Sequence, residues 1–314
     1  MPAPERVPAL SAPVEQPLPE VDPVASAALA ADPDRALALL RAGELRIHGR
    51  LTESSNAAFY CTVDDGEQQA VCVYKPVRGE RPLWDFPDGT LAGREVAAYQ
   101  VSAAIGWHLV PPTVLRDGPY GEGMCQIWVE SDPDAELLAL HDTEEPGPGW
   151  CAIGRADVGE GRTALLVHAD DPRLRRMAVL DSVLNNADRK GGHLLPAVDG
   201  RLYGIDHGVT FAVPGKLRTL LWGWAGQPLP PEAAEALVAL RAQLPDDGAG
   251  EDGVPDGGAG GPADGQGDGL AGRLAALITA AELQAVRDRV DALLRTGRHP
   301  EPSGDWPAVP WPPI

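Results

Sequence analysis

The pattern of apolar and polar positions divides the chain into a strand-rich part followed by a more helical part. Between residues 44 and 130 the apolar runs are short, contain β-branched and aromatic residues, and are separated by turn-like segments, which is typical of β-strands. The predicted strands are ELRIHGRL (44–51), AAFYCTV (57–63), QAVCVYK (69–75), VPPTVLRD (110–117) and MCQIWVE (124–130). A segment with helical spacing, 91–106, lies among them and predicts a helix that ends at Gly106.

Helical spacing dominates after residue 131. The predicted helices are 132–141, 172–184, 231–244 and 270–294. HLLPAV (193–198) and RLYGID (201–206) flank Asp199-Gly200 and predict a β-hairpin. We therefore expect an α+β fold, in which a small antiparallel sheet with one helix precedes a larger and mainly helical lobe.

Composition marks the segments outside these two lobes. Pro-, Ala- and acid-rich residues predict a disordered N-terminus, with a short helix at 33–42 as the exception, and a Gly/Asp-rich stretch predicts a flexible acidic loop. The expected units are a mostly disordered tail (1–42), an N-terminal lobe (43–130), a C-terminal lobe (131–298) with an acidic loop (246–269), and a Pro/Trp-rich tail (299–314).

The net charge of −20 changes the list of expected partners. An acidic surface repels the phosphates of nucleic acids and anionic lipids, so we expect neither as a main partner. No apolar stretch approaches the roughly 18–20 residues of a spanning helix, and the N-terminus does not resemble a signal peptide. We expect a cytoplasmic protein without stable membrane anchoring. Its four cysteines lack CxxC spacing and are expected to be reduced, buried thiols.

Phosphoryl transfer requires a cation for the phosphates, oxygens for a metal, a carboxylate for the acceptor and a cover over the triphosphate. Lys75 ends a predicted strand, from which an ammonium can reach a phosphate, and Glu95 on the next helix could orient it. Asp188 and Arg189 follow a helix on a polar turn, and Asp206 follows a strand. Each of these residues, taken alone, also fits an ordinary surface or turn position.

Three segments, taken in order, resemble the phosphatidylinositol 3/4-kinase superfamily. They are LDSVLNNADRKGGHLL (180–195), LYGIDHGVTF (202–211) and LLWGWAGQPLP (220–230), and upstream VYKP resembles the Lys-Pro strand end of that family. The likeness is to the type II phosphatidylinositol 4-kinases and to an actinobacterial family grouped beside them. It covers roughly residues 43 to 300 and implies a two-lobed protein-kinase-like fold that binds ATP with Mg²⁺ or Mn²⁺.

The resemblance implies roles for the charged residues. Lys75 would bind the α- and β-phosphates, with Glu95 as its partner. Asp188 would orient or deprotonate the acceptor hydroxyl, with Arg189 beside it in the catalytic loop. From its spacing alone, seven residues before Asp188, Asp181 could cap this loop or brace Arg189. Asp206 would ligate the metal.

Other roles fall on backbone groups. Ser54, Ser55 and Asn56 would cover the phosphates with their N–H groups, although this turn lacks the usual glycines. The segment QIWVE, with Ile127 and Val129, would be the hinge that offers backbone groups to adenine.

Two departures from the family pattern affect the function. His193 stands where the family has a second metal-binding Asn; imidazole suits Mn²⁺ better than Mg²⁺, so either the metal differs, or Asn186 or water compensates, or catalysis is weaker. The interval 78–93 lacks the cysteine-rich, lipidated insertion of the lipid kinases. This absence argues against a phosphoinositide substrate in a bilayer.

Three functions fit these residues. The first is a kinase that acts on a protein side chain or a soluble hydroxyl compound, which the joint presence of Lys75, Asp188 and Asp206 favours. The second is a nucleotide-binding, pseudokinase-type regulatory module, which His193 and the glycine-poor turn favour. The third is a phosphatidylinositol kinase. Lys216 and Arg218 either meet the negative charge of an acceptor or are surface residues.

Overall fold

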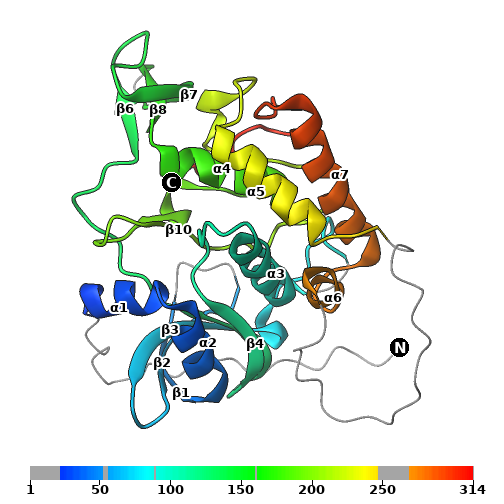
Figure 1. Cartoon of the computed structure of the whole chain (residues 1–314). Helices are drawn as coiled ribbons and strands as arrows, with labels where there is room; N and C mark the ends of the chain where they lie inside the picture. Colours follow the sequence, from blue (N-terminus) through cyan, green and yellow to red (C-terminus); the bar gives the residue numbers. More distant parts are fainter. Residues whose placement is uncertain (1–21, 52–55, 88–89, 160, 247–268, 314) are drawn as a thin grey trace, which may run out of the picture.

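The computed structural model describes residues 22–51, 56–87, 90–159, 161–246 and 269–313. These residues form two lobes, with a β-sheet in one and most of the helices in the other (Figure 1). The N-terminal lobe contains an antiparallel sheet in the order β1-β2-β3-β5-β4. Its strands are β1 (Glu44–Arg50), β2 (Phe59–Asp64), β3 (Gln69–Pro76), β4 (Thr113–Gly118) and β5 (Gly121–Ile127). The expected strand-rich lobe is confirmed.

Helix α3 (Leu91–Ala104) connects the sheet to the rest of the molecule. Thr90 caps its N-terminus by accepting the Gly93 N–H at 2.8 Å. The helix contacts β4 and β5 on one side and α6 (Leu270–Ala275) on another. Because α3 is enclosed by both lobes, most of its residues are buried, including Glu95.

Two helices precede the sheet, α1 (Pro23–Ala30) and α2 (Pro33–Ala42). Asp22 and Asp32 cap them, and a proline opens each, which is the ordinary start of a helix. The helix at 33–42 was expected, but α1 was not, so the prediction of a mostly disordered tail is wrong for this part. The apolar faces of both helices belong to the same buried cluster as the sheet, and this burial orders them.

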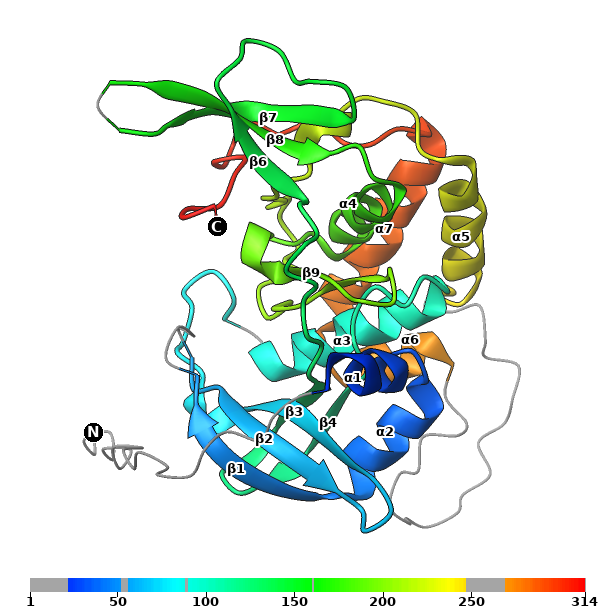
Figure 2. The same cartoon turned by 90° about the vertical axis from the view of Figure 1, so that its left-hand side faces the viewer.

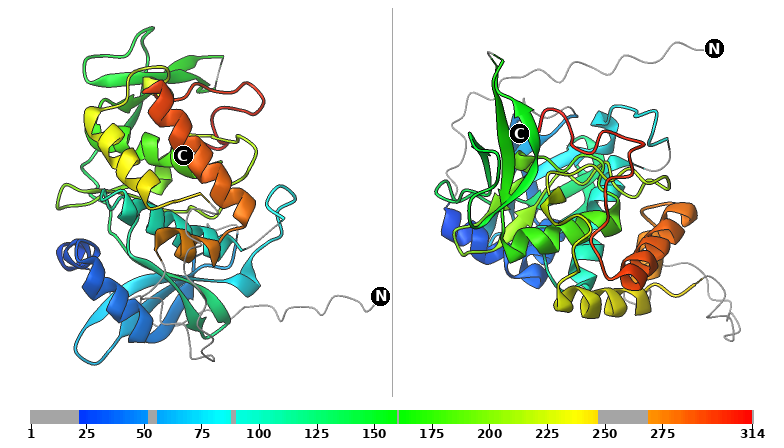
Figure 3. Two further views of the ribbon diagram at one scale, coloured as in Figure 1. Left: turned by 45° about the vertical axis from the view of Figure 1, so that its right-hand side comes forward. Right: turned by 90° about the horizontal axis from the view of Figure 1, so that it is seen from above.

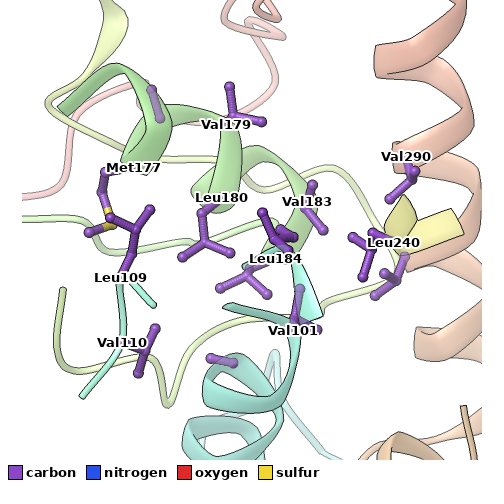
Figure 4. Packing of buried hydrophobic residues seen from close by; sticks show 14 of the residues in the cluster. Val101, Leu109, Val110, Met177, Val179, Leu180, Val183, Leu184, Leu240 and Val290 are labelled. Atoms are coloured by element: carbon purple, nitrogen blue, oxygen red, sulfur yellow. The ribbon is translucent and has the colours of Figure 1, made fainter. Parts of the chain in front are cut away.

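The C-terminal lobe is built around α4 (Pro172–Leu184), with α5 (Pro231–Ala242), α6 and α7 (Ala280–Thr296) beside it. Figure 3 shows α5 and α7 lying side by side. Buried side chains of α4 pack against Val101 of α3 and against Leu109 and Val110, which follow it (Figure 4). This shared core holds α3, and with it Glu95, in a fixed position against the C-terminal lobe. None of the described helices is long and apolar enough to span a bilayer.

Two predicted helices are wrong in detail. Residues 132–141 contain the strand β6 (Leu138–His141), which joins a three-stranded sheet with β8 (Thr163–Ala169) and β7 (Trp150–Asp157). This sheet projects from the C-terminal lobe (Figure 2). The strand that pairs with β6 is β8, which comes later in the chain. This pairing outweighs the helical preference of the Glu, Leu and Ala residues in 132–141.

The predicted helix 270–294 is interrupted between α6 and α7. Thr279 caps α7 by accepting the Glu282 N–H, while the Glu282 carboxylate accepts the Thr279 N–H, so a new helix begins there. The expected hairpin is present as β9 (Leu194–Pro196) and β10 (Leu202–Gly204). The cysteines are free thiols, three of them buried and Cys151 partly buried. Nearly all of the predicted acidic loop, and Ser54 and Ser55, lie outside the described residues.

Candidate active site

Three charged side chains from distant parts of the chain meet between the lobes. The Lys75 ammonium at the end of β3 lies 2.6 Å from the Glu95 carboxylate of α3 and 2.8 Å from the Asp206 carboxylate. The second Glu95 oxygen accepts the His207 N–H at 2.9 Å. Glu95 is buried, whereas the Asp206 side chain is 51% exposed. The Lys75 ammonium thus lies between the buried Glu95 carboxylate and the accessible Asp206 carboxylate.

The neighbouring charges keep this cluster ionised. Burial would lower the pKa of Lys75, but Asp206 and Glu95 outweigh it and raise that pKa. The Lys75 ammonium lowers the pKa of Asp206 well below its usual range, against the effect of burial. Burial raises the pKa of Glu95, and Lys75 opposes this rise. Lys75 is therefore a cation and Asp206 an anion at neutral pH.

The loop after α4 presents Asp188 to the same cleft. Asn185 ends the helix in the left-handed conformation, at φ +53°. Asn186 then donates its side-chain N–H to Asp181 at 3.0 Å and accepts the Asp188 N–H at 2.9 Å. Asn186 is fully buried and both ends of its amide are hydrogen-bonded within this loop.

Arg189 does not face the cleft. Its guanidinium is fully buried and forms an ion pair with buried Asp181 at 2.8 Å. It also donates to the carbonyl oxygens of His193 and Ile205 and contacts His207 Nε2 at 2.7 Å. The expectation that Asp181 braces Arg189 is confirmed, but the placement of Arg189 among residues that contact substrate is wrong. Its role is to fix the loop that carries Asp188.

Asp206 and His193 are the described residues best placed to hold a metal. His193 Nε2 lies 3.4 Å from Asp206 Oδ2, and burial lowers the pKa of His193, so its imidazole is neutral at pH 7. No group of three or more His, Cys, Asp or Glu that could hold a metal occurs among the described residues. The Asp206 carboxylate fits Mg²⁺ or Mn²⁺ bound jointly with phosphate oxygens and water, and the neutral His193 imidazole suits Mn²⁺ better than Mg²⁺.

A cavity of about 440 Å³ joins these groups. Both lobes line this cavity. Its polar and charged lining residues include Asn56, Lys75, Glu80, Glu95, Asp188, Lys190, His193 and Asp206. Asn56 accepts the Arg81 N–H at 2.9 Å, and Asn56 itself lines the cavity. Glu80 accepts the N–H groups at the start of α3 and therefore already caps that helix end.

The predicted hinge residues lie elsewhere. Ile127 and Val129 are buried and are not among the residues that line the cavity. The Ile127 N–H donates to the Pro112 carbonyl oxygen at 3.1 Å, and the Trp128 N–H donates to that of Val71 at 3.0 Å. The structure therefore does not bring this segment together with the charged cluster, and its adenine-binding role stays a prediction.

Lys190 was missed in the sequence. Its ammonium lies 3.2 Å from the Asp188 carboxylate and lines the cavity. The composition could have indicated Lys190 as a candidate site residue, because the chain contains only three lysines, Lys75, Lys190 and Lys216. Two of them line the cleft. The third, Lys216, is buried against Asp85 at 2.7 Å, so it is neither a surface residue nor free to meet an acceptor.

A larger cavity of about 700 Å³ lies within the C-terminal lobe, where Trp222, Arg289 and Leu293 are among its lining residues. It contains none of the charged cluster around Lys75. Volume alone would favour it as a ligand site, but the charged cluster of Lys75, Glu95 and Asp206 lies in the smaller cleft.

The chain is similar to two known proteins. Protein Rv2133c of Mycobacterium tuberculosis is 47% identical over 284 residues, which cover 88% of this chain and 94% of that protein. Phosphatidylinositol 4-kinase gamma 4 of Oryza sativa subsp. japonica is 26% identical over 232 residues, which cover 61% of this chain but only 36% of the rice protein. No family model matches the chain.

Similar solved structures include the Golgi casein kinase, with a TM-score of 0.47 and 14% identity over 84% of this chain and 73% of that one. The same kinase with Mn and ADP bound has a TM-score of 0.46 and 13% identity over 86% and 80% of the two chains. The rice match supports the resemblance to the phosphatidylinositol 3/4-kinase-like superfamily that the motifs indicated. The chain belongs to the same family as Protein Rv2133c, a family similar to phosphatidylinositol 4-kinases.

Proposed function

We propose that this protein is an ATP-dependent phosphotransferase that moves the γ-phosphate to a protein side chain or another soluble hydroxyl acceptor. One observation carries the proposal: Lys75 lines one cavity between two lobes together with Asp188 and Asp206, which lie more than a hundred residues after it in the sequence. The cavity is of a size that suits a small-molecule ligand. Its charges are those that phosphate transfer requires.

The residues suggest a direct in-line transfer. Lys75, held by Glu95, binds the phosphates of ATP. Asp188 accepts the proton of the acceptor hydroxyl while the bond from that oxygen to the γ-phosphorus forms and the bond to the β-phosphate oxygen breaks. Lys190, beside Asp188, neutralises charge on the phosphoryl group during transfer. The products are ADP and the phosphorylated acceptor, with no covalent intermediate on the protein.

Asp206 and His193 would hold the divalent metal together with phosphate oxygens. When bound there, the metal supplies neutralisation of the β- and γ-phosphate charge. Asp206 adopts the left-handed backbone conformation, at φ +59°, between Ile205 and the buried His207. This turn directs the Asp206 carboxylate to the Lys75 ammonium, which would bind the phosphates. The Asp206 oxygen atoms therefore face the position expected for those phosphates.

A nucleotide-binding module is the second candidate, and His193 favours it. A protein that binds ATP without rapid transfer needs the Lys75 cation but not the Asp188 base. A lipid kinase is the third candidate, which the rice similarity favours and the net charge of −20 opposes. The two kinase functions differ in their phosphate acceptor, and the binding module transfers no phosphate. All three functions would use the same nucleotide site.

Lys75→Met tests the shared site. We expect ATP affinity to fall at least tenfold and label transfer from γ-labelled ATP to fall by about 10²–10³-fold, because a charge-assisted contact to phosphate is lost. Isothermal titration with ATP and either Mg²⁺ or Mn²⁺ measures the first effect, and transfer to the protein itself or to a basic protein measures the second. Arg78→Met, at an exposed position three residues later, is the matched control and should change neither value more than about twofold.

Thermal unfolding of both variants separates lost binding from lost folding, because Met at position 75 leaves Glu95 buried without its cation. Absence of ATP binding by the unaltered chain with either metal would contradict the proposal.

A further inference from the structure

The C-terminal tail, residues 306–313, lies along residues 216–222, which follow the metal-binding turn (red in Figure 2). The Ala308 carbonyl oxygen accepts the Thr219 N–H at 3.1 Å and the Trp222 indole N–H at 2.8 Å. The Arg218 guanidinium donates to the Pro307 carbonyl oxygen at 3.0 Å. The tail is thus held through its backbone carbonyls.

Residues 216–222 also contact the catalytic loop on their other side. The Arg189 N–H donates to the Arg218 carbonyl oxygen at 3.0 Å, and the Arg218 N–H donates to that of Asn186 at 2.9 Å. At its far end the tail reaches the loop directly, where the Gly191 N–H donates to the Pro313 carbonyl oxygen at 2.9 Å. Gly191 is three residues from Asp188. The tail therefore touches the loop that carries Asp188, directly at Gly191 and indirectly through residues 216–222.

The tail also makes a further hydrogen bond, from the Arg218 guanidinium to the Val309 carbonyl oxygen at 3.4 Å, and an aromatic contact. The Lys216 ammonium, which is bonded to Asp85, lies 4.5 Å from the centre of the Trp306 ring. Pro310 is buried, whereas Trp311 is 82% exposed. The tail is therefore anchored at both ends and in the middle, although its described residues form no helix or strand.

The chemistry of this surface indicates what it recognises. It offers a row of N–H donors, and the tail supplies carbonyl acceptors from an extended chain in which four of the eight residues are proline. A single lipid headgroup or a small polyol cannot supply a row of spaced carbonyls. Residues 304–313 also contain no Ser, Thr or Tyr, so this part of the tail has no hydroxyl to phosphorylate.

We propose that residues 216–222 with Gly191 form the docking surface for an extended segment of a protein acceptor, and that the tail occupies this surface as a competitor that cannot be phosphorylated. The proposal rests on the phosphotransferase function above and narrows its acceptor to a protein. The tail limits access of acceptors and leaves the ATP cavity open, because no tail residue lines that cavity.

The test compares the full chain with a variant that lacks residues 304–314, using ATP and myelin basic protein as a basic probe acceptor. We expect the KM for the acceptor to fall at least fivefold, with the KM for ATP unchanged within twofold. A synthetic peptide of residues 305–313, DWPAVPWPP, should bind the shortened chain in fluorescence polarisation. It should also compete with the acceptor and not with ATP.

Trp306→Ala provides a second route if the shortened chain does not fold, because it removes the ring over Lys216 and leaves the backbone intact. Its matched control is Trp311→Ala, which removes an exposed ring and should leave the KM for the acceptor unchanged. If transfer occurs but neither variant nor the peptide alters the KM for the acceptor, the docking proposal is wrong and the phosphotransferase stands. If no variant transfers phosphate, the proposed function itself fails, and the docking proposal fails with it.

Discussion

Asp188→Asn is expected to lower the rate of phosphate transfer by about 10²–10⁴-fold while changing ATP affinity by less than about threefold. The amide keeps the shape of the carboxylate and can still contact Lys190, but it cannot take the acceptor proton. Each factor of ten in rate corresponds to about 1.36 kcal/mol of transition-state stabilisation. The loss would therefore appear in kcat and not in nucleotide binding.

Single-turnover transfer and an ATP titration on the same protein preparation separate the two quantities. Asp142→Asn is the matched control, because Asp142 is exposed and lies outside the cavity, so both quantities should stay unchanged. Transfer that survives Asp188→Asn would show that this carboxylate is not the base. An unaltered chain that binds ATP tightly, yet transfers no phosphate to any acceptor, would instead identify the nucleotide-binding module.

Local signals made the N-terminal lobe predictable. Each strand of the five-stranded sheet is short, contains β-branched or aromatic residues and ends at a turn, so its type does not depend on distant partners. Helices α3 and α4 likewise carry their own signals, and α4 runs over the expected residues, Pro172–Leu184. The positions of Lys75, Asp188 and Asp206 at element ends followed from these local assignments.

Long-range pairing decided the elements that were not predicted. Residues 138–141 form a strand because β8 pairs with them, and nothing in their own composition indicates this. Helix α1 has a weak amphipathic pattern, and it is ordered by packing on the sheet. The Pro/Trp-rich tail likewise takes its conformation from contacts with residues 216–222.

The catalytic loop illustrates the same limit at the level of single residues. Asp188 and Arg189 are adjacent and charged, and sequence alone treats both as residues of a polar turn. Whether each side chain is buried depends on two partners of Arg189. One is the Ile205 carbonyl oxygen, directly after the hairpin β9–β10, and the other is Asp181 within α4. These partners enclose Arg189 and leave Asp188 at the cavity. Fold context, and not residue type, thus separates the side chain that faces the cavity from the one that is enclosed beneath it.

Arg189→Met is expected to lower the free energy of unfolding by about 3–5 kcal/mol, because it leaves the Asp181 carboxylate buried without its cation. Both side chains of this pair are fully buried. For a domain of this size the loss corresponds to a fall in Tm of about 6–20 °C. Thermal unfolding followed by circular dichroism measures it.

Arg176→Met is the matched control, since Arg176 lies on α4 and forms a 3.5 Å pair with Glu232 in which both side chains are more than 40% exposed. Exposed pairs contribute about 0–1 kcal/mol, so Tm should change by no more than a few degrees. A double variant, Arg189→Met with Asp181→Leu, should recover part of the lost stability because no unpaired charge remains in the core. If the double variant were less stable than Arg189→Met alone, the hydrogen bond that Asp181 accepts from the Asn186 side chain would contribute more than the unpaired buried charge costs.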